Sequence, residues 1–353
     1  GSGQAAALSA AQLGAVETAD LAAMSTGAIR ALTLTALAGL STAQMAALTG
    51  AQAIALTTAQ LAALSTAQAA ALDTADLGAF GSAALRAMSP SAIAGLTSAQ
   101  IQSLSGTQFA ALTSAQIGAL TTAQMAVLET ADLAALTTAQ LRVLGAPQLD
   151  ALGSAQFAAL TSKQVLALSS TQVAGLSSDD LNALTSTQFA LLTSAQIGAL
   201  SAGRMATLET ADLAALGSAA LRAIPVASIP SLTSAEIQAL STAQAAVLTT
   251  AQIGALLSAQ IAALETADLA ALTTAQVRTL SDAQLAALDS AQMPAFGTRQ
   301  IAALGSAQVT GLASDELVAM SSTQFAALTS AQAAALGAAQ VASIESGDLA
   351  ALG

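Results

Sequence analysis

Apolar residues recur at every eighth position along the whole chain. Every residue whose number is a multiple of eight is apolar, and 36 of these 44 residues are leucine. With this residue taken as position 8 of an octad, position 5 is always apolar or alanine and position 7 is nearly always small. Position 4 is glutamine in 28 octads, and position 1 is usually serine or threonine. The pattern therefore predicts one structural unit of eight residues, repeated without a break in register.

Each octad carries the signals of a short helix. Serine or threonine at position 1 with glutamine at position 4 has the spacing of a capping box, as in Thr57 and Gln60. Alanine, leucine and glutamine favour helix, and Pro90 occupies the first helical position, where proline is tolerated. We expect one capped helix of about a turn and a half per octad. Pro230 and Pro294 lie inside the expected helices, so their octads should be distorted or shorter.

The period of eight selects an all-α solenoid among the possible folds. A continuous helix would let the apolar stripe drift by about 80° per octad, so no seam could form. A β-solenoid would need alternating, β-branched residues, and a membrane span would need about 20 apolar residues in a row. One octad cannot bury its apolar residues alone, whereas a stack of octads can. We expect positions 5, 7 and 8 to face a narrow core and positions 2, 3 and 6 to face solvent.

A longer period is superimposed on the octads. Acidic octads begin at residues 17, 73, 129, 209, 265 and 345, which are seven or ten octads apart. Seventeen octads make a 136-residue module, and residues 4–353 hold about 2.6 copies of it in one continuous solenoid. About 3.4 octads per superhelical turn would bring the acidic octads to one face of an elongated rod. With layers roughly 8–10 Å apart, the rod would be roughly 100–130 Å long.

An arginine follows the aspartate of each complete acidic octad by ten residues. We interpret these residues as structural charge pairs, and a stripe of such charges could also contact a partner or cation. Exposed pairs contribute only about 0–1 kcal/mol, so the recurrence indicates placement more than stability. The pairs are Asp20 and Arg30, Asp76 and Arg86, Asp132 and Arg142, Asp212 and Arg222, and Asp268 and Arg278.

Composition narrows the possible chemistry. The chain has no cysteine, histidine, tryptophan or tyrosine, and only 8% of its residues are charged. Without these side chains we expect no enzyme activity and no bound cofactor. A net charge of −12 argues against a nucleic-acid partner. Weak calcium binding is conceivable at the acidic pairs Asp179 with Asp180 and Asp315 with Glu316, although no ligand loop surrounds them. The rows of hydroxyls are explained by capping and need no ice-binding role.

Octads of the form Thr-Thr-Ala-Gln-Leu-Ala-Ala-Leu, each preceded by the leucine of the octad before, resemble the octapeptide-repeat regions of giant adhesin-like or haemagglutinin-like proteins of Gram-negative bacteria. The resemblance implies a rod-like stalk, spacer or filament segment on the cell surface or outside the cell. An alternative is a binding module whose charged face holds calcium, polysaccharide or a sister rod, by side-by-side or end-to-end association. A designed repeat is a third origin, against which the irregular seven/ten spacing argues. Residues 1–3 look like an expression-tag remnant.

Overall fold

The protein is built from very short helices, one in each octad. The computed structural model describes residues 1–352, and within them there are 42 α-helices, two 3-10 helices and no strand. The expected all-α repeat architecture is confirmed. The chain divides into two compact units, Gly1–Leu184 and Thr185–Gly353, and the division falls between two octads.

The first unit contains α1 to α23. Their bounds are α1 Ser2–Ala5, α2 Ala10–Gly14, α3 Thr18–Ala23, α4 Thr26–Ala31, α5 Leu34–Ala38, α6 Thr42–Ala46, α7 Gly50–Ala55, α8 Thr58–Ala62, α9 Thr66–Ala70, α10 Thr74–Ala79, α11 Ser82–Ala87, α12 Pro90–Ala94, α13 Ser98–Gln102, α14 Gly106–Ala111, α15 Ser114–Gly118, α16 Thr122–Ala126, α17 Thr130–Ala135, α18 Thr138–Arg142, α19 Ala146–Asp150, α20 Ser154–Ala158, α21 Ser162–Ala167, α22 Ser170–Gly175 and α23 Ser178–Asn182.

The second unit contains α24 to α42 and both 3-10 helices. Their bounds are α24 Ser186–Phe189, α25 Ser194–Ile197, α26 Ala202–Met205, α27 Thr210–Ala215, α28 Ser218–Ala223, η1 Val226–Ser231, α29 Ser234–Gln238, α30 Thr242–Val247, α31 Thr250–Ala255, α32 Ser258–Ala262, α33 Thr266–Ala271, α34 Thr274–Val277, α35 Asp282–Leu285, η2 Met293–Ala295, α36 Thr298–Ala303, α37 Ser306–Gly311, α38 Ser314–Ala319, α39 Ser322–Phe325, α40 Ser330–Ala335, α41 Ala338–Ser343 and α42 Ser346–Ala351.

The capping box predicted from the sequence begins most helices. At α8, the Gln60 backbone N–H donates to Thr57 Oγ1 (3.2 Å), and the Thr57 backbone N–H donates to Gln60 Oε1 (2.8 Å). Where glycine replaces the hydroxyl residue, the return bond remains, as from Gly145 N to Gln148 Oε1 (2.9 Å). Pro90 is the first residue of α12, as expected.

The two octads with an internal proline depart from the α-helix. Pro230 lies within η1 and Pro294 within η2, and these are the 3-10 helices of the described chain. Proline at position 6 cannot donate the backbone hydrogen bond that an α-helix needs there, so the turn tightens instead. The predicted distortion of both octads is confirmed.

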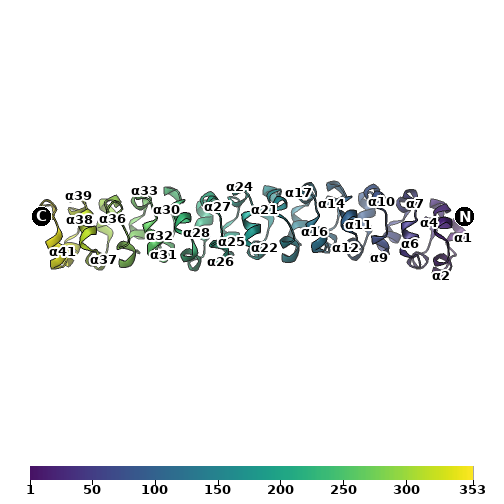
Figure 1. Ribbon diagram of the computed structural model, residues 1–353, viewed down its shortest axis with the longest axis horizontal. Coiled ribbons are helices and arrows are strands. Elements are labelled where there is room, and N and C mark those ends of the chain that lie inside the picture. The colour runs from purple at the N-terminus through teal and green to yellow at the C-terminus, as the bar shows by residue number, and fades with distance from the viewer. Residues whose placement is uncertain (353) are drawn as a thin grey trace. The chain divides into compact units, whose positions relative to one another are not determined.

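Octads stack in a regular order within each unit (Figure 1). The helix pairs that pack on one another are three octads apart, for example α14 on α17 and α30 on α33. The position-4 glutamine side chain reaches one octad further and binds the octad four before it. At α15, Gln116 Nε2 donates to the backbone carbonyls of Leu85 (2.7 Å) and Met88 (2.8 Å). Neighbours at both three and four octads are the contacts expected of a superhelical turn near 3.4 octads.

The core consists of positions 5 and 8, as the apolar pattern predicts. Ile117 and Phe109 at position 5 are fully buried, and Leu120 at position 8 is nearly so. The expectation for position 7 is wrong, because most of these small residues are partly or fully exposed, as Ala63 is. Position 4 contributes to the interior instead of position 7. Its glutamine side chains are buried and hydrogen-bonded to backbone carbonyls, as Gln116 is.

Candidate functional site

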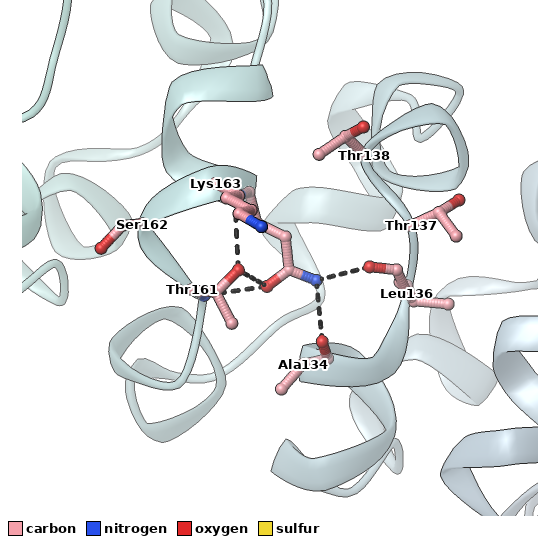
Figure 2. A pocket seen from close by; sticks show the side chains of 8 residues that line it. Ala134, Leu136, Thr137, Thr138, Thr161, Ser162 and Lys163 are labelled. Carbon is pink, nitrogen blue, oxygen red and sulfur yellow. Dashed lines mark hydrogen bonds between the residues drawn. The ribbon is translucent and has the colours of Figure 1, made fainter.

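Two surface grooves, one in the first unit and one in the second, are lined by residues that correspond at a spacing of 136 residues. The first groove has a volume of about 560 Å³ and is lined by Ala134, Leu136, Thr137, Thr138, Thr161, Ser162, Lys163 and Gln164. It lies between the end of α17, the start of α18 and the start of α21. Figure 2 shows Thr137 and Thr138 on one side of this groove and Thr161 and Ser162 on the other.

The floor of the first groove is fixed by the same glutamine contacts that stack the octads. Gln164 Oε1 accepts from the Thr161 backbone N–H (2.8 Å) and hydroxyl (3.0 Å). Gln164 Nε2 donates to the carbonyls of Leu133 (2.7 Å) and Leu136 (2.9 Å). The glutamine amide is therefore satisfied, and the Thr161 and Thr137 hydroxyls are used in caps, so the exposed Thr138, Ser162 and Lys163 remain to meet a ligand.

The second groove lies 136 residues further along the chain. It has a volume of about 420 Å³ and is lined by Ala270, Leu272, Thr273, Thr274, Gly297, Thr298, Arg299 and Gln300. Arg299 stands where Lys163 stands in the first groove, and Gln300 Nε2 donates to the carbonyls of Leu269 (2.8 Å) and Leu272 (2.7 Å). Both grooves thus combine one cation with several hydroxyls, a set that suits an anionic, hydroxyl-rich group.

The aspartates of the acidic octads are mostly buried. Asp76, Asp132, Asp212 and Asp268 have between 2% and 8% of their surface exposed, so they do not form a surface stripe. Asp76 and Asp132 point to position 2 of the octad three before, because an added Cβ at Gly50 would lie 2.9 Å from Asp76 Oδ1 and one at Gly106 would lie 3.6 Å from Asp132 Oδ1. The exposed acids of these octads are at position 1, as Glu129 is.

Burial changes the acidity of three of these aspartates. Desolvation, followed by the nearby Glu129 charge, raises the pKa of Asp132 from 3.8 to about 6. Desolvation and Asp73 raise the pKa of Asp76 in the same way. Desolvation raises the pKa of Asp212 too, with Glu209 adding to the rise and a hydrogen bond from Ser186 opposing it. These carboxyls belong to the packed interior rather than to a surface binding site.

Comparison with protein families identifies the repeat. The family model described as the ALTTAQ repeat matches residues 13–50, 69–106, 125–162, 173–210, 205–242 and 261–298, which together make up more than half of the chain. The chain belongs to the ALTTAQ repeat family. The six-residue sequence itself occurs at residues 55–60, 119–124, 135–140 and 271–276. No curated protein matches the chain. The expected repeat character is therefore confirmed, while the likeness to adhesins and haemagglutinins has no support beyond the octads.

The predicted charge pairs of this ALTTAQ repeat protein stay a prediction. The contacts that the structure describes for these residues are with other groups. Arg142 Nε donates to the backbone carbonyl of Ala167 (2.8 Å), three octads further along. Asp20 is exposed in the third octad, whereas the later aspartates are covered by neighbouring turns.

The residues proposed for weak calcium binding act as helix caps. Asp180 Oδ2 accepts from the Ser177 backbone N–H (2.9 Å), and Glu316 Oε2 accepts from the Ala313 backbone N–H. They replace the capping glutamine, while Asp179 and Asp315 lie beside them at position 3. Among residues 1–352, no three acidic, histidine or cysteine side chains gather into a potential metal site. The ALTTAQ repeat also offers no helix, within those residues, that could span a membrane.

Proposed function

We propose that this ALTTAQ repeat protein is a spacer, a stalk or filament segment whose length is set by its number of octads. The observation that carries the proposal is the repetition of one contact set. Octads pack on octads three away, and a position-4 glutamine bonds to the octad four before it, as Gln116 does. Because an octad contacts earlier and later octads in the same way, further octads can be added to the chain without a new kind of contact.

Deleting whole modules tests the spacer function. Removal of one 136-residue module keeps the octad register, so the shortened chain should fold and its maximum dimension in small-angle X-ray scattering should fall in proportion to length. Removal of 132 residues breaks the register and serves as the control, which should lose helix content or solubility. A maximum dimension that does not change after removal of the module would contradict the proposal.

The location that we propose is the cell surface or the space outside the cell. An acidic chain without cysteine is compatible with export, and a spacer is of use where it projects a functional end. An antibody against the repeat should label intact, unpermeabilised source cells. Labelling that appears only after permeabilisation would place the spacer inside the cell.

A second candidate function rests on the two grooves. We propose that Lys163 and Arg299 with their flanking hydroxyls hold acidic groups of a polysaccharide, two weak sites on one chain giving avidity. Replacing both cations by glutamine should abolish retention on an acidic polysaccharide column, whereas Arg30→Gln, at an exposed position outside the grooves, should leave it unchanged. Equal retention of all variants would remove this candidate and leave the spacer.

A further inference from the structure

One buried acid breaks the hydrogen-bonding rule of the octads. Glu236 occupies position 4 of residues 233–240, where most octads have glutamine, and only 2% of its surface is exposed. Its Oε2 accepts from the Thr233 backbone N–H (2.6 Å) and hydroxyl (2.8 Å). Its second oxygen, Oε1, is buried and has no hydrogen-bond partner among the described residues.

A glutamine two octads away shows what normally fills the place of this oxygen. Gln252 Oε1 accepts from the Thr249 backbone N–H (2.8 Å), as Glu236 Oε2 does from Thr233. Gln252 Nε2 donates to the carbonyls of Leu221 and Ile224, both at 2.9 Å, which lie 31 and 28 residues earlier. At the same spacings of 31 and 28 residues, the carbonyls that correspond for Glu236 are those of Met205 and Leu208, and we infer from this register that Oε1 lies opposite them. An acceptor thus faces acceptors at the end of α26.

A charged carboxylate in this place would be costly. A carboxylate oxygen has no proton to give to the carbonyls, and the carboxy-terminal end of a helix carries partial negative charge. Burying one oxygen of a charged carboxylate without a hydrogen-bond donor is strongly unfavourable. A neutral carboxyl group removes the conflict, because its O–H reproduces one N–H of glutamine.

The spacing favours a proton over a metal ion as the occupant. Glutamine nitrogens keep 2.6 to 2.9 Å from the two carbonyls in the neighbouring octads of Gln252 and Gln260. That separation is the length of an O–H···O hydrogen bond. A hard cation needs about 2.3–2.6 Å to each oxygen and so would push the oxygens further apart.

We propose that Glu236 is a buried proton-binding site, whose neutral carboxyl donates its Oε1 proton to the carbonyl of Met205 or Leu208. On folding, the carboxylate of the unfolded chain takes one proton from solvent and forms the O–H bond, and no other bond changes. The second unit therefore gains stability from this site as the pH falls, and loses it as the pH rises.

The elements around Glu236 carry charged residues of both signs. Glu236 lies on α29, which packs on α27 and α32, and the register inferred above places its Oε1 near the end of α26. Arg204 on α26 precedes Met205 directly and favours the charged carboxylate, while Asp212 on α27 and Glu209 at its N-cap oppose it. Helix α32 carries no charged residue. The Thr233 N–H and hydroxyl bonded to Oε2 also favour the carboxylate, whereas the burial of Oε1 opposite the carbonyls favours the neutral form.

The test compares Glu236→Gln with the reverse exchange at an equivalent position, Gln252→Glu, both made in the full chain. Glu236→Gln supplies a permanent donor, so at neutral pH its Tm should rise by roughly 2–4 °C, and the gain should vanish in acid. Gln252→Glu should have a lower Tm than the parent at neutral pH, and this loss of Tm should disappear in acid. The infrared band of a neutral carboxylic acid should be present in the parent at neutral pH, weaken in Glu236→Gln and grow in Gln252→Glu.

Two outcomes would overturn the proton site. If the parent and Glu236→Gln keep the same Tm difference from acid to neutral pH and the same acid band, then Glu236 is charged in the folded protein. If dialysis against a chelator, or exchange of sodium for a large organic cation, lowers the Tm of the parent but not of Glu236→Gln, a metal ion occupies the place instead. Exposed Glu345→Gln serves as the control for a change of net charge.

Discussion

At the scale of single residues, the position-4 glutamine uses both ends of its amide. Oε1 completes the capping box of its own octad, and Nε2 binds carbonyls at the end of a helix four octads earlier. A helix of five or six residues has nearly all its backbone groups at its ends, where they lack partners within the helix. One side chain per octad thus satisfies the beginning of one helix and the end of another.

Two glutamines that make the same capping bonds allow the contribution of the cap to be measured apart from that of the carbonyl contacts. Gln116 makes both the cap and the carbonyl contacts, whereas Gln12 lies in the second octad, is exposed, and has only the cap described. We expect Gln116→Ala to lower the free energy of unfolding by about 1–3 kcal/mol, since it leaves buried carbonyls unpaired, and Gln12→Ala to cost less than about 1 kcal/mol. Urea unfolding measures both, and equal losses would show that the cap alone matters.

Asp132 should make the first unit sensitive to pH. Its pKa is raised to about 6 in the folded chain, above the usual 3.8, so folding binds a proton there. The resulting stability is fully present below about pH 4 and is lost as the pH rises through about 6. We expect Asp132→Asn to be more stable than the parent at pH 7 and to flatten the dependence of Tm on pH between 4 and 7.

The exposed aspartate of the third octad provides the matched control for Asp132. Asp20 has the same sequence neighbours, Thr-Ala-Asp-Leu, but lies at the surface. Asp20→Asn changes net charge by the same amount and should leave the shape of the Tm profile intact. Parallel profiles for the parent and Asp132→Asn would mean that Asp132 remains charged on folding.

At the scale of elements, the sequence predicts the local structure well and the contacts between turns poorly. The caps, the apolar positions 5 and 8 and the distorted octads of Pro230 and Pro294 follow from spacings within eight residues. The burial of glutamine does not, because its partners lie 28 to 31 residues earlier and the number of octads per turn must first be known. The grooves also form between octads that are far apart in the sequence. Their one sequence signal is the basic residue at equivalent positions of two modules, Lys163 and Arg299.

Close approach of two helices is tested at Gly39, just after α5. A Cβ built there would lie 2.5 Å from the carbonyl oxygen of Ala10 and 2.8 Å from its Cα, on the stacked helix α2. Backbone atoms cannot yield as a flexible side chain does, so Gly39→Ala should destabilise by about 1–3 kcal/mol despite the helix preference of alanine. Gly81→Ala, whose Cβ would meet nothing within 4 Å, should be neutral or slightly stabilising. A similar stability for the two variants, measured by thermal unfolding, would contradict the close packing.

At the scale of the whole molecule, stability is expected to be local rather than shared. The helix contacts that the structure describes join octads three apart, and the glutamine bonds join octads four apart, so contacts within a unit are between nearby octads. In such a chain the free energy is nearly a sum of octad terms and neighbour terms. A destabilising substitution should therefore favour local unfolding of the octads near it and leave the remaining octads of that unit folded. This is a useful property for a spacer.

Leu144 is suited to test this locality because it is a buried position-8 leucine well inside the first unit. Leu144→Ala should cost about 2–5 kcal/mol, as a cavity forms in the narrow core. Octads up to four away share direct contacts with it, so hydrogen exchange should rise within residues 105–176 and stay near the parent level outside them. Leu144→Met keeps the volume and should change exchange little. A uniform rise along the first unit would show that it unfolds as one cooperative body, and the additive description of the octads would then be wrong.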